Sequence, residues 1–414
     1  MSKLSKITIS ILAVWLVVVA LATTLTFVTA TSKVTQSLDV MVEAASLTQQ
    51  CQQAVRQLKV QQGIDTYPQI DKFDTGMLGI PSISEYMDYF DGSWDDYDNQ
   101  FGSLLAITTT PGKLASKRTS CDPNWAGYMV SLYQRAGLKA GDQVGMTFSG
   151  SFPALNIAAL ASAQVYGLKI CVMSGIGASY FGANDPRLTF FEMAQHLCDV
   201  GLLIHRIDYV SLGGEDDVLD NRFANTEEGK QHINRITQVI QASTAKFIYQ
   251  PDFNANVEMR IDYFAQDLPQ MKLFVNVGGS MVGLGSGTSA FTNSGYFKGG
   301  KIYSQSKRLY NQGLLQYYKQ IGLPVVNIIN VQQIAEQQRV PYADDKMTVA
   351  PQIGLTDYNV KQGYYAFYYV RSYSPIYAVV AISLSVVLAV LYAYCRKKYA
   401  TNNQQGRNLL MGGH

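Results

Sequence analysis

The sequence predicts an α/β fold with an open, mostly parallel, Rossmann-like sheet in an extracytoplasmic domain, flanked by N-terminal and C-terminal transmembrane helices. Three features of the 414 residues predict it. Uncharged apolar runs lie near both ends, at residues 7–29 and 376–394. Strand-length apolar runs alternate with helical periodicity in the middle, an order typical of parallel sheets. Several of these strands end in turns rich in Gly, Ser and Thr.

Residues 1–32 are expected to form a cytoplasmic tip and a transmembrane signal anchor. Lys3 and Lys6 precede the apolar run, which is longer than the about 20 residues that cross a bilayer. A cleavable signal peptide usually has a hydrophobic region of roughly 7–15 residues, so the length favours an uncleaved anchor. Because Val28-Thr29-Ala30 is compatible with a cleavage site, the sequence leaves cleavage open.

Residues 375–395 are expected to form a second transmembrane helix, followed by a basic cytoplasmic tail at 396–414. The tail begins with Arg396-Lys397-Lys398, a stop that a buried core helix does not explain. Residues 341–374 are expected to be a return segment that leads to this helix. Six tyrosines between residues 364 and 377 are typical of an aromatic belt at a membrane interface.

The charges of the two ends indicate their orientation. The chain has 33 basic and 31 acidic residues, and the two ends together hold six basic residues and no acidic one. The middle therefore keeps 27 basic and 31 acidic residues, a net charge of −4. By the positive-inside rule, we expect both termini to be cytoplasmic and the main domain to be periplasmic or extracellular. The two expected spans also make the lipid bilayer of the cell membrane a partner of the chain. The slightly acidic middle has no basic stripe, which argues against nucleic acid.

Residues 33–100 are expected to form a stalk helix and an irregular connector. Apolar residues recur at helical spacing from Val34 to Leu58, so we expect this helix to continue the first membrane helix outward. Its Gln-rich face could instead mediate self-association into a homo-oligomer. Residues 65–100 lack a clear period, and the acidic, aromatic segment 85–98 lacks calcium-loop spacing. A solvated surface is the favoured interpretation of that segment.

Residues 101–340 are expected to form the α/β domain. The Asp122-Pro123 pair has the chemistry of a helix start, with an N-cap followed by proline. The predicted strands are 104–108, 143–148, 169–174, 208–212, 246–249, 272–277 and 324–329, and the predicted helices are 123–136, 153–166, 189–200, 226–242, 253–267 and 304–321.

Ligands of open α/β sheets bind beyond the carboxyl ends of the strands, where the strand order reverses. The turns after five predicted strands therefore predict a binding cleft with two nearby cations. The candidate binding residues are Thr108, Thr109, Thr110, Ser149, Gly150, Ser151, Gly177, Ser179, Asn184, Asp185, Gly213, Gly214, Glu215, Asn276, Gly278 and Gly279, together with Lys117 and Arg118.

The turn Ser149-Gly150-Ser151 is the strongest candidate among these. It lies between a predicted strand and a helix that begins at Pro153. Free N–H groups at such a helix start attract anions, and Gly150 would let a ligand approach the backbone. The alternative is an ordinary strand–helix connection in which a serine caps the helix.

No established catalytic, nucleotide-binding or metal-binding motif appears in the sequence, and we expect no cofactor and no metal. The histidines lie away from the turns, so a serine–histidine pair is not supported. The acids Asp185 and Glu215 to Asp217 could hold a divalent ion, although solvated loops are the commoner explanation. Buried free thiols are favoured for Cys51, Cys121, Cys171 and Cys198, whose disulfide status the sequence leaves open.

The order and spacing of these turns resemble a known family, the poly-gamma-glutamate system proteins. The resembling segments cover roughly residues 100–285. They are Thr108-Thr109-Thr110-Pro111-Gly112, Ala115-Ser116-Lys117-Arg118-Thr119-Ser120, Ser149-Gly150-Ser151-Phe152-Pro153-Ala154-Leu155-Asn156, Gly177-Ala178-Ser179, Gly182-Ala183-Asn184-Asp185-Pro186, Ser211-Leu212-Gly213-Gly214 and Asn276-Val277-Gly278-Gly279.

The resemblance implies a membrane-anchored accessory subunit that acts in the biosynthesis, export or retention of poly-γ-glutamate, an anionic capsule-type polymer. It implies the polymer, the poly-γ-glutamate ligase and its polytopic membrane subunit as partners, and it assigns no catalytic residue. The C-terminal membrane span departs from the N-terminal anchor usual in the family. One alternative is an extracytoplasmic hydrolase or transpeptidase acting on the γ-glutamyl polymer, against which the missing base argues. A sensor for a small carboxylate is a third.

Overall fold

The computed structural model describes residues 3–214, 217–285, 294–298, 312–343 and 347–411. The chain divides into two compact units, residues 1–35 with 369–414, and residues 36–368. The first unit is a pair of long helices with a short two-stranded sheet. The second is an α/β unit with a seven-stranded sheet.

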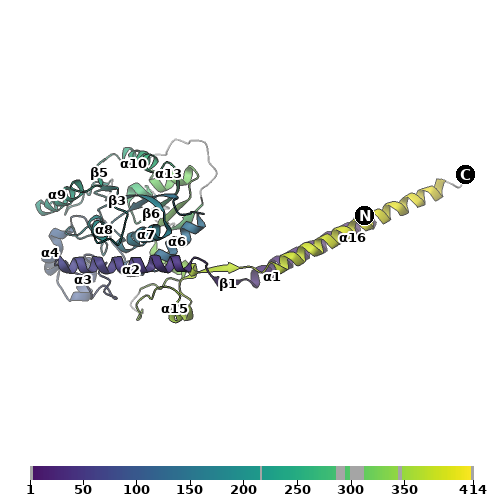
Figure 1. Cartoon of the computed structure of the whole chain (residues 1–414), viewed down its shortest axis with the longest axis horizontal. Coiled ribbons are helices and arrows are strands. Elements are labelled where there is room, and N and C mark those ends of the chain that lie inside the picture. Colours follow the sequence, from purple (N-terminus) through teal and green to yellow (C-terminus); the bar gives the residue numbers. More distant parts are fainter. Residues whose placement is uncertain (1–2, 215–216, 286–293, 299–311, 344–346, 412–414) are drawn as a thin grey trace. The chain divides into compact units, whose positions relative to one another are not determined.

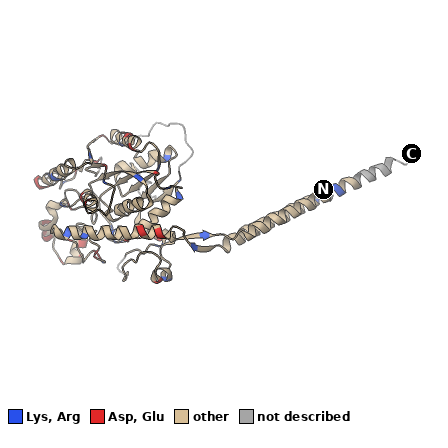
Figure 2. Cartoon of the chain, viewed as in Figure 1, with Lys and Arg blue, Asp and Glu red and all other residues tan. Residues whose placement is uncertain are grey.

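Both apolar ends form long helices, α1 (Lys3–Val28) and α16 (Ile376–Met411). Each contains a stretch long and apolar enough to span a membrane, at Lys6–Val28 and Ile376–Thr401. The two helices run antiparallel side by side, with both chain ends at the same end of the pair (Figure 1). Trp15 Nε1 donates a hydrogen bond to Ser385 Oγ across the pair, at 2.9 Å. The sequences of both helices contain no acidic residue, and Figure 2 shows none in the described part of the pair.

Two short strands, one after α1 and one before α16, pair with each other. Strand β1 (Thr31–Val34) pairs with β9 (Tyr369–Ser372) in antiparallel register. Phe27 and Tyr373 pack edge to face beside them, with ring centroids 5.5 Å apart. The expectation that residues from Val34 onward continue the first membrane helix is therefore wrong, because β1 interrupts the helical chain.

Helix α2 (Leu38–Gln61), expected as a stalk, is part of the α/β unit. It packs against α6 (Trp125–Arg135) and α7 (Pro153–Tyr166). Its apolar positions Met41, Ala44, Ala45 and Val55 are fully buried. Helical spacing alone predicted the helix but not its partner, since a stalk and a core helix share the same period. The expected connector holds two short helices, α3 (Ile83–Phe90) and α4 (Trp94–Phe101).

The seven-stranded sheet confirms the predicted α/β class, and six of its strands are parallel. The strand order is β5-β4-β3-β2-β6-β8-β7, and only β7 is antiparallel to its neighbour. The strands are β2 (Gln143–Phe148), β3 (Lys169–Gly175), β4 (Tyr209–Ser211), β5 (Lys246–Ile248), β6 (Met271–Val277), β7 (Gly295–Phe297) and β8 (Val325–Ile328). From β2 the chain moves outward to β5 and then returns to β6 on the other side of β2. The order therefore reverses between β2 and β6.

Helices connect these strands as the alternating pattern predicts. The connecting helices that match predicted ones are α7, α8 (Phe190–Asp199), α9 (Glu227–Gln241), α10 (Phe253–Asp267) and α13 (Leu314–Gln320). The short helices α11 (Met281–Leu284), after β6, and α14 (Val331–Gln338), after β8, were not predicted. Parallel crossovers are right-handed, so α7 and α10, which lead in opposite directions along the sheet, lie on opposite faces. On the face of α10, Phe264 and Tyr318 pack against Phe274 of β6. Residues 304–311 of the predicted helix 304–321 lie outside the described residues.

Two local predictions in the first part of the α/β unit are wrong. Residues 104–108 do not form a strand, because the chain makes a 3-10 turn, η1 (Gly102–Leu105), and then a single parallel bridge from Thr108 to Ala178. Their apolar side chains are buried. A short apolar run in a sequence indicates burial but does not distinguish a buried turn from a buried strand. Helix α6 begins at Trp125 rather than Pro123, since Asp122 accepts hydrogen bonds from the backbone and side chain of Asn124 and from the Tyr365 hydroxyl.

The expected aromatic belt is only partly available to a membrane interface. Tyr365 and Tyr368 are fully buried in the α/β unit. Tyr365 donates to Asp122 at 2.9 Å, and Tyr368 donates to Asn124 at 2.7 Å. Their hydroxyls complete a buried polar group beside α6, so these two tyrosines are core residues. The return segment also contains α15 (Asp357–Gln362) and η3 (Ala366–Tyr368).

Candidate functional site

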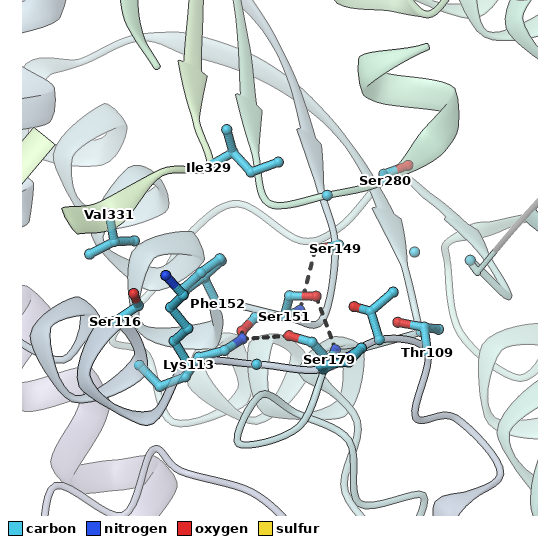
Figure 3. A pocket seen from close by; sticks show the side chains of 18 of the residues that line it. Thr109, Lys113, Ser116, Ser149, Ser151, Phe152, Ser179, Ser280, Ile329 and Val331 are labelled. Carbon is cyan, nitrogen blue, oxygen red and sulfur yellow. Dashed lines mark hydrogen bonds between the residues drawn. The ribbon is translucent and has the colours of Figure 1, made fainter. Parts of the chain in front are cut away.

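A cavity of about 590 Å³ opens at the carboxyl edge of the sheet, where the strand order reverses between β2 and β6 (Figure 3). Residues that follow β2, β3, β4, β6 and β8 line it, together with segment 109–113 and α5 (Leu114–Ser120). Its volume is within the range of ligand-binding pockets. The candidate residues that line it are Thr109, Thr110, Lys117, Ser149, Ser151, Gly177, Ser179, Gly213, Gly214 and Gly279.

The amides of the strongest candidate turn do not have the role that the sequence suggested. Ser149 N–H donates to the Val277 carbonyl at 3.1 Å, and Gly150 N–H donates to the Gly177 carbonyl at 3.1 Å. Ser151 N–H points to Ser149 Oγ at 3.3 Å. The expectation that these three amides are free to receive a carboxylate is therefore wrong, because the protein itself supplies their acceptors.

Gly150 is required by packing rather than by ligand access. A Cβ atom at this position would lie 2.7 Å from the Ile176 carbonyl oxygen and 2.9 Å from Ala178 Cβ. The chain after β3 thus occupies the space that a side chain at Gly150 would fill. The close approach that glycine permits here is that of the protein's own backbone.

Lys117 on α5 is the buried cation of the cavity. Its side chain is 2% exposed, although its residue lines the cavity wall. Nζ donates to the Ser151 carbonyl and to Ser179 Oγ, the latter at 2.7 Å. It also lies 4.0 Å from the centroid of the Phe152 ring. Burial lowers the pKa of the Lys117 ammonium from 10.5 to about 7, because the low-polarity surroundings disfavour its charged form.

Ser151 and Ser179 meet at this lysine from two different turns. Ser179 N–H donates to Ser151 Oγ at 3.1 Å, and both side chains are nearly buried. Figure 3 shows these two serines beside each other in the pocket. The turn after β3 is held in place by segment 107–110, since Thr109 N–H donates to the Ala178 carbonyl and Tyr180 N–H donates to the Thr110 carbonyl. The serine–lysine contact is therefore fixed by the main chain of three segments.

The charge of the cavity favours an anion. Lys113 and Lys117 line it, and none of the lining residues in the described part of the chain is acidic. Lys113 is exposed, and Figure 3 shows it between Ser116 and Phe152. A cleft lined by one sign of charge attracts ligands of the opposite sign. Carboxylate and phosphate groups are therefore the chemistry that this cavity suits.

Four other charged candidates have partners within the protein or lie outside the described residues. Asp185 accepts bonds from the Arg187 guanidinium, the shortest at 2.6 Å. Asp217 forms a buried ion pair with Arg260 and accepts from Ser211 Oγ. Glu215 and Asp216 lie outside the described residues, and Asp217 is not free to hold a metal. In the described ranges, no group of three or more His, Cys, Asp or Glu side chains is placed to bind a metal ion.

The remaining candidates support the site without lining it. Arg118 points away from the cavity and donates to the Ile70 carbonyl at 2.7 Å, while its guanidinium lies over the Tyr89 ring. Asn276 accepts from Thr147 Oγ1 and donates to Asn327 beneath the strand ends. Asn184 donates to Thr108 Oγ1. Gly278 has a φ of +89°, and a Cβ atom there would meet Ser149 Oγ.

Sequence reasoning missed one wall of the cavity and one contact inside it. Ile329, Asn330, Val331 and Gln332, which follow β8, line the cavity. This turn follows a correctly predicted strand at the same edge, so its position was the available signal. The contact between Lys117 and Ser179 spans 62 residues, and no short motif could indicate it.

Cys51, Cys121 and Cys171 are buried with free thiols, and Cys198 is half-buried and also free. Burial raises the pKa values of the Cys51 and Cys121 thiols to about 12. They are therefore neutral and take no part in nucleophilic chemistry at ordinary pH.

The chain matches no protein-family model, no curated protein and no solved structure.

Proposed function

We propose that this chain is a membrane-anchored accessory subunit in the biosynthesis, export or retention of poly-γ-glutamate, and that its cavity holds carboxylates of the polymer. The observation that carries the proposal is the pair of lysines, Lys113 and Lys117, in a cavity whose described lining has no acid. Each unit of γ-linked glutamate presents a free carboxylate. An exposed cation in a cavity without an acid suits a ligand that offers repeated anionic groups, and the protonated form of Lys117 adds a second positive charge.

The membrane arrangement belongs to the same proposal. Antiparallel packing of α1 and α16 supports both termini on the same side of a bilayer. The basic ends support the cytoplasmic side, which leaves residues 36–368 outside the cell or in the periplasm. The ligase and its polytopic membrane subunit are the partners of this proposal, and self-association remains part of it. A label-accessible C-terminal tail on the outer face of intact cells would contradict this topology.

Binding of γ-linked tetraglutamate to the full chain in a non-ionic detergent, measured by calorimetry, tests the proposal. Lys113→Ala should weaken binding by about 1 kcal/mol, about fivefold in Kd, because an exposed cation at a carboxylate contributes about that much. Lys169→Ala is the matched control, since Lys169 is exposed at the opposite end of β3. Binding should weaken as salt rises. Equal affinities for the two variants, or no binding by the wild type, would refute the proposed ligand.

A further inference from the structure

We infer that the cavity is also an acyl-transfer site, in which Ser179 is the nucleophile and Lys117 is its general base. The bond cleaved is an amide or ester next to a carboxylate. Only that substrate class rests on the proposed function, because the two catalytic residues are argued from their own geometry. The inference supplies the base that the sequence alone did not reveal.

The contact between the two side chains is suited to proton transfer. Lys117 Nζ and Ser179 Oγ are 2.7 Å apart, within the range expected for a nucleophile and its base. Both residues line the cavity, so a substrate that enters it reaches the hydroxyl. Lysine serves as a base when burial keeps part of its population neutral, and the protein provides that burial here.

The surroundings of Lys117 leave its charge without an acidic partner. No ion pair joins it to a carboxylate in the part of the chain that the structure describes. Cys121 at the end of α5 donates its S–H to the Lys117 carbonyl at 3.3 Å, and its raised pKa keeps it a neutral thiol. Phe152 covers the other side, and Lys113 is the second cation of the cavity. Burial lowers the pKa of Lys117 to about 7, which favours its neutral form relative to an exposed lysine.

Ser151 is a positioning residue rather than the nucleophile. Lys117 contacts the Ser151 carbonyl, whereas it contacts the side-chain oxygen of Ser179. Ser151 Oγ accepts the backbone N–H of Ser179, which fixes the turn that carries the nucleophile. The geometry therefore gives the two serines different roles.

The reaction balances with water or an amine as the second reactant. Ser179 Oγ attacks the carbonyl carbon of the substrate while its proton passes to neutral Lys117 Nζ. The C–N or C–O bond then breaks, and the leaving group takes that proton from the lysine. An ester to Ser179 remains. Water or an acceptor amine attacks the ester, giving its proton to Lys117 and then to Ser179, which regenerates both groups and releases the acid or the new amide.

An alkyl fluorophosphonate, which reacts with activated serine hydroxyls independently of substrate, tests this inference on the full chain in detergent. Mass spectrometry should place the adduct on Ser179. The labelling rate should rise with pH to a plateau, with a midpoint near 7, because neutral Lys117 is the active form. Lys117→Met and Ser179→Ala should each lower the rate at least about 100-fold, the usual contribution of a general base.

Two matched controls separate catalysis from damage to the fold. Lys59 is a second buried lysine, whose Nζ donates to the Leu78 carbonyl and whose pKa burial lowers to about 8. Lys59→Met should therefore leave labelling of Ser179 unchanged. Ser162→Ala, which removes a buried hydroxyl bonded to the Tyr133 hydroxyl, should do the same. Circular dichroism of each variant confirms folding.

Three outcomes overturn the inference: no adduct on Ser179 in the wild type, an adduct on Ser151 instead, or an unchanged rate in folded Lys117→Met. The wild-type pH profile needs no variant, so a Lys117→Met protein that fails to fold still leaves a decisive measurement. Failure of the proposed function is separate, since calorimetry of the wild type with γ-linked tetraglutamate measures binding independently of serine labelling. Labelling without such binding would keep the acyl-transfer site and reject the polymer.

Discussion

Replacing Lys117 with methionine changes how the stability of the protein depends on pH. The pKa of Lys117 falls from 10.5 in the unfolded chain to about 7 in the folded protein, a difference that corresponds to about 5 kcal/mol. Below pH 7 the lysine is charged in both states, and folding carries the whole penalty. Above pH 7 the unfolded chain binds more protons than the folded one, so the free energy of unfolding rises with pH.

The rise from pH 7 to pH 9 should be about 2 kcal/mol larger in the wild type than in Lys117→Met, because the folded protein still binds part of a proton at Lys117 near pH 7. Urea unfolding of the full chain in a non-ionic detergent, followed by tryptophan fluorescence, to which the buried Trp125 contributes, measures both proteins. Lys59→Met is the control, because its lysine begins to contribute only near pH 8. Lys59→Met should therefore keep the increase in the free energy of unfolding between pH 7 and pH 8. A difference between wild type and Lys117→Met that does not change with pH would refute the lowered pKa and the neutral base.

Two further predictions concern packing around the site. Gly150→Ala should lower the free energy of unfolding by about 1–3 kcal/mol, because its new methyl group would meet a carbonyl oxygen 2.7 Å away. Tyr365→Phe should cost about 1–3 kcal/mol, since it removes the Tyr365 hydroxyl, one of the three hydrogen-bond donors of the buried Asp122 carboxylate. The pKa of Asp122 is raised by burial to about 6, so this cost should be larger at pH 8, where the carboxylate is charged, than at pH 5.

The same urea assay checks both variants. Tyr249→Phe is the control for Tyr365, because the Tyr249 side chain is 61% exposed. A folded Gly150→Ala protein as stable as the wild type would show that the turn can open to admit a side chain. A cost of Tyr365→Phe that is the same at pH 5 and pH 8 would contradict the buried charge at Asp122.

The fold was predictable where local pattern and long-range packing agree. The strand Gln143–Phe148 and the helix Pro153–Tyr166 have the predicted bounds, because apolar period, proline and a following Gly167 all mark the same limits. The strand predicted at residues 104–108 was wrong, because burial of Leu105 to Ile107 is compatible with a turn as well as with a strand. Helix α2 shows the same limit, because its period reveals an apolar face but not what covers it.

The location of the site could be predicted from the sequence, but the hydrogen bonds and charges of its residues could not. The rule that ligands bind beyond strand ends located the cavity, and its serines and glycines could be named from the turns. The use of their N–H groups could not be predicted, because the acceptors, such as the carbonyls of Gly177 and Val277, come from distant segments. The partner of Lys117 was hidden for the same reason. Hydrogen bonds between remote residues depend on the packed structure, which local sequence does not encode.

The central claim, that this cavity receives γ-linked glutamate, is tested most directly by an experimental structure of the full-length Ser179→Ala protein with γ-linked tetraglutamate. The account predicts ligand density in the cavity between β2 and β6, with one carboxylate within hydrogen-bond distance of Lys113 Nζ and a γ-amide carbonyl next to residue 179. Density at any other surface, with this cavity holding only solvent, would contradict it.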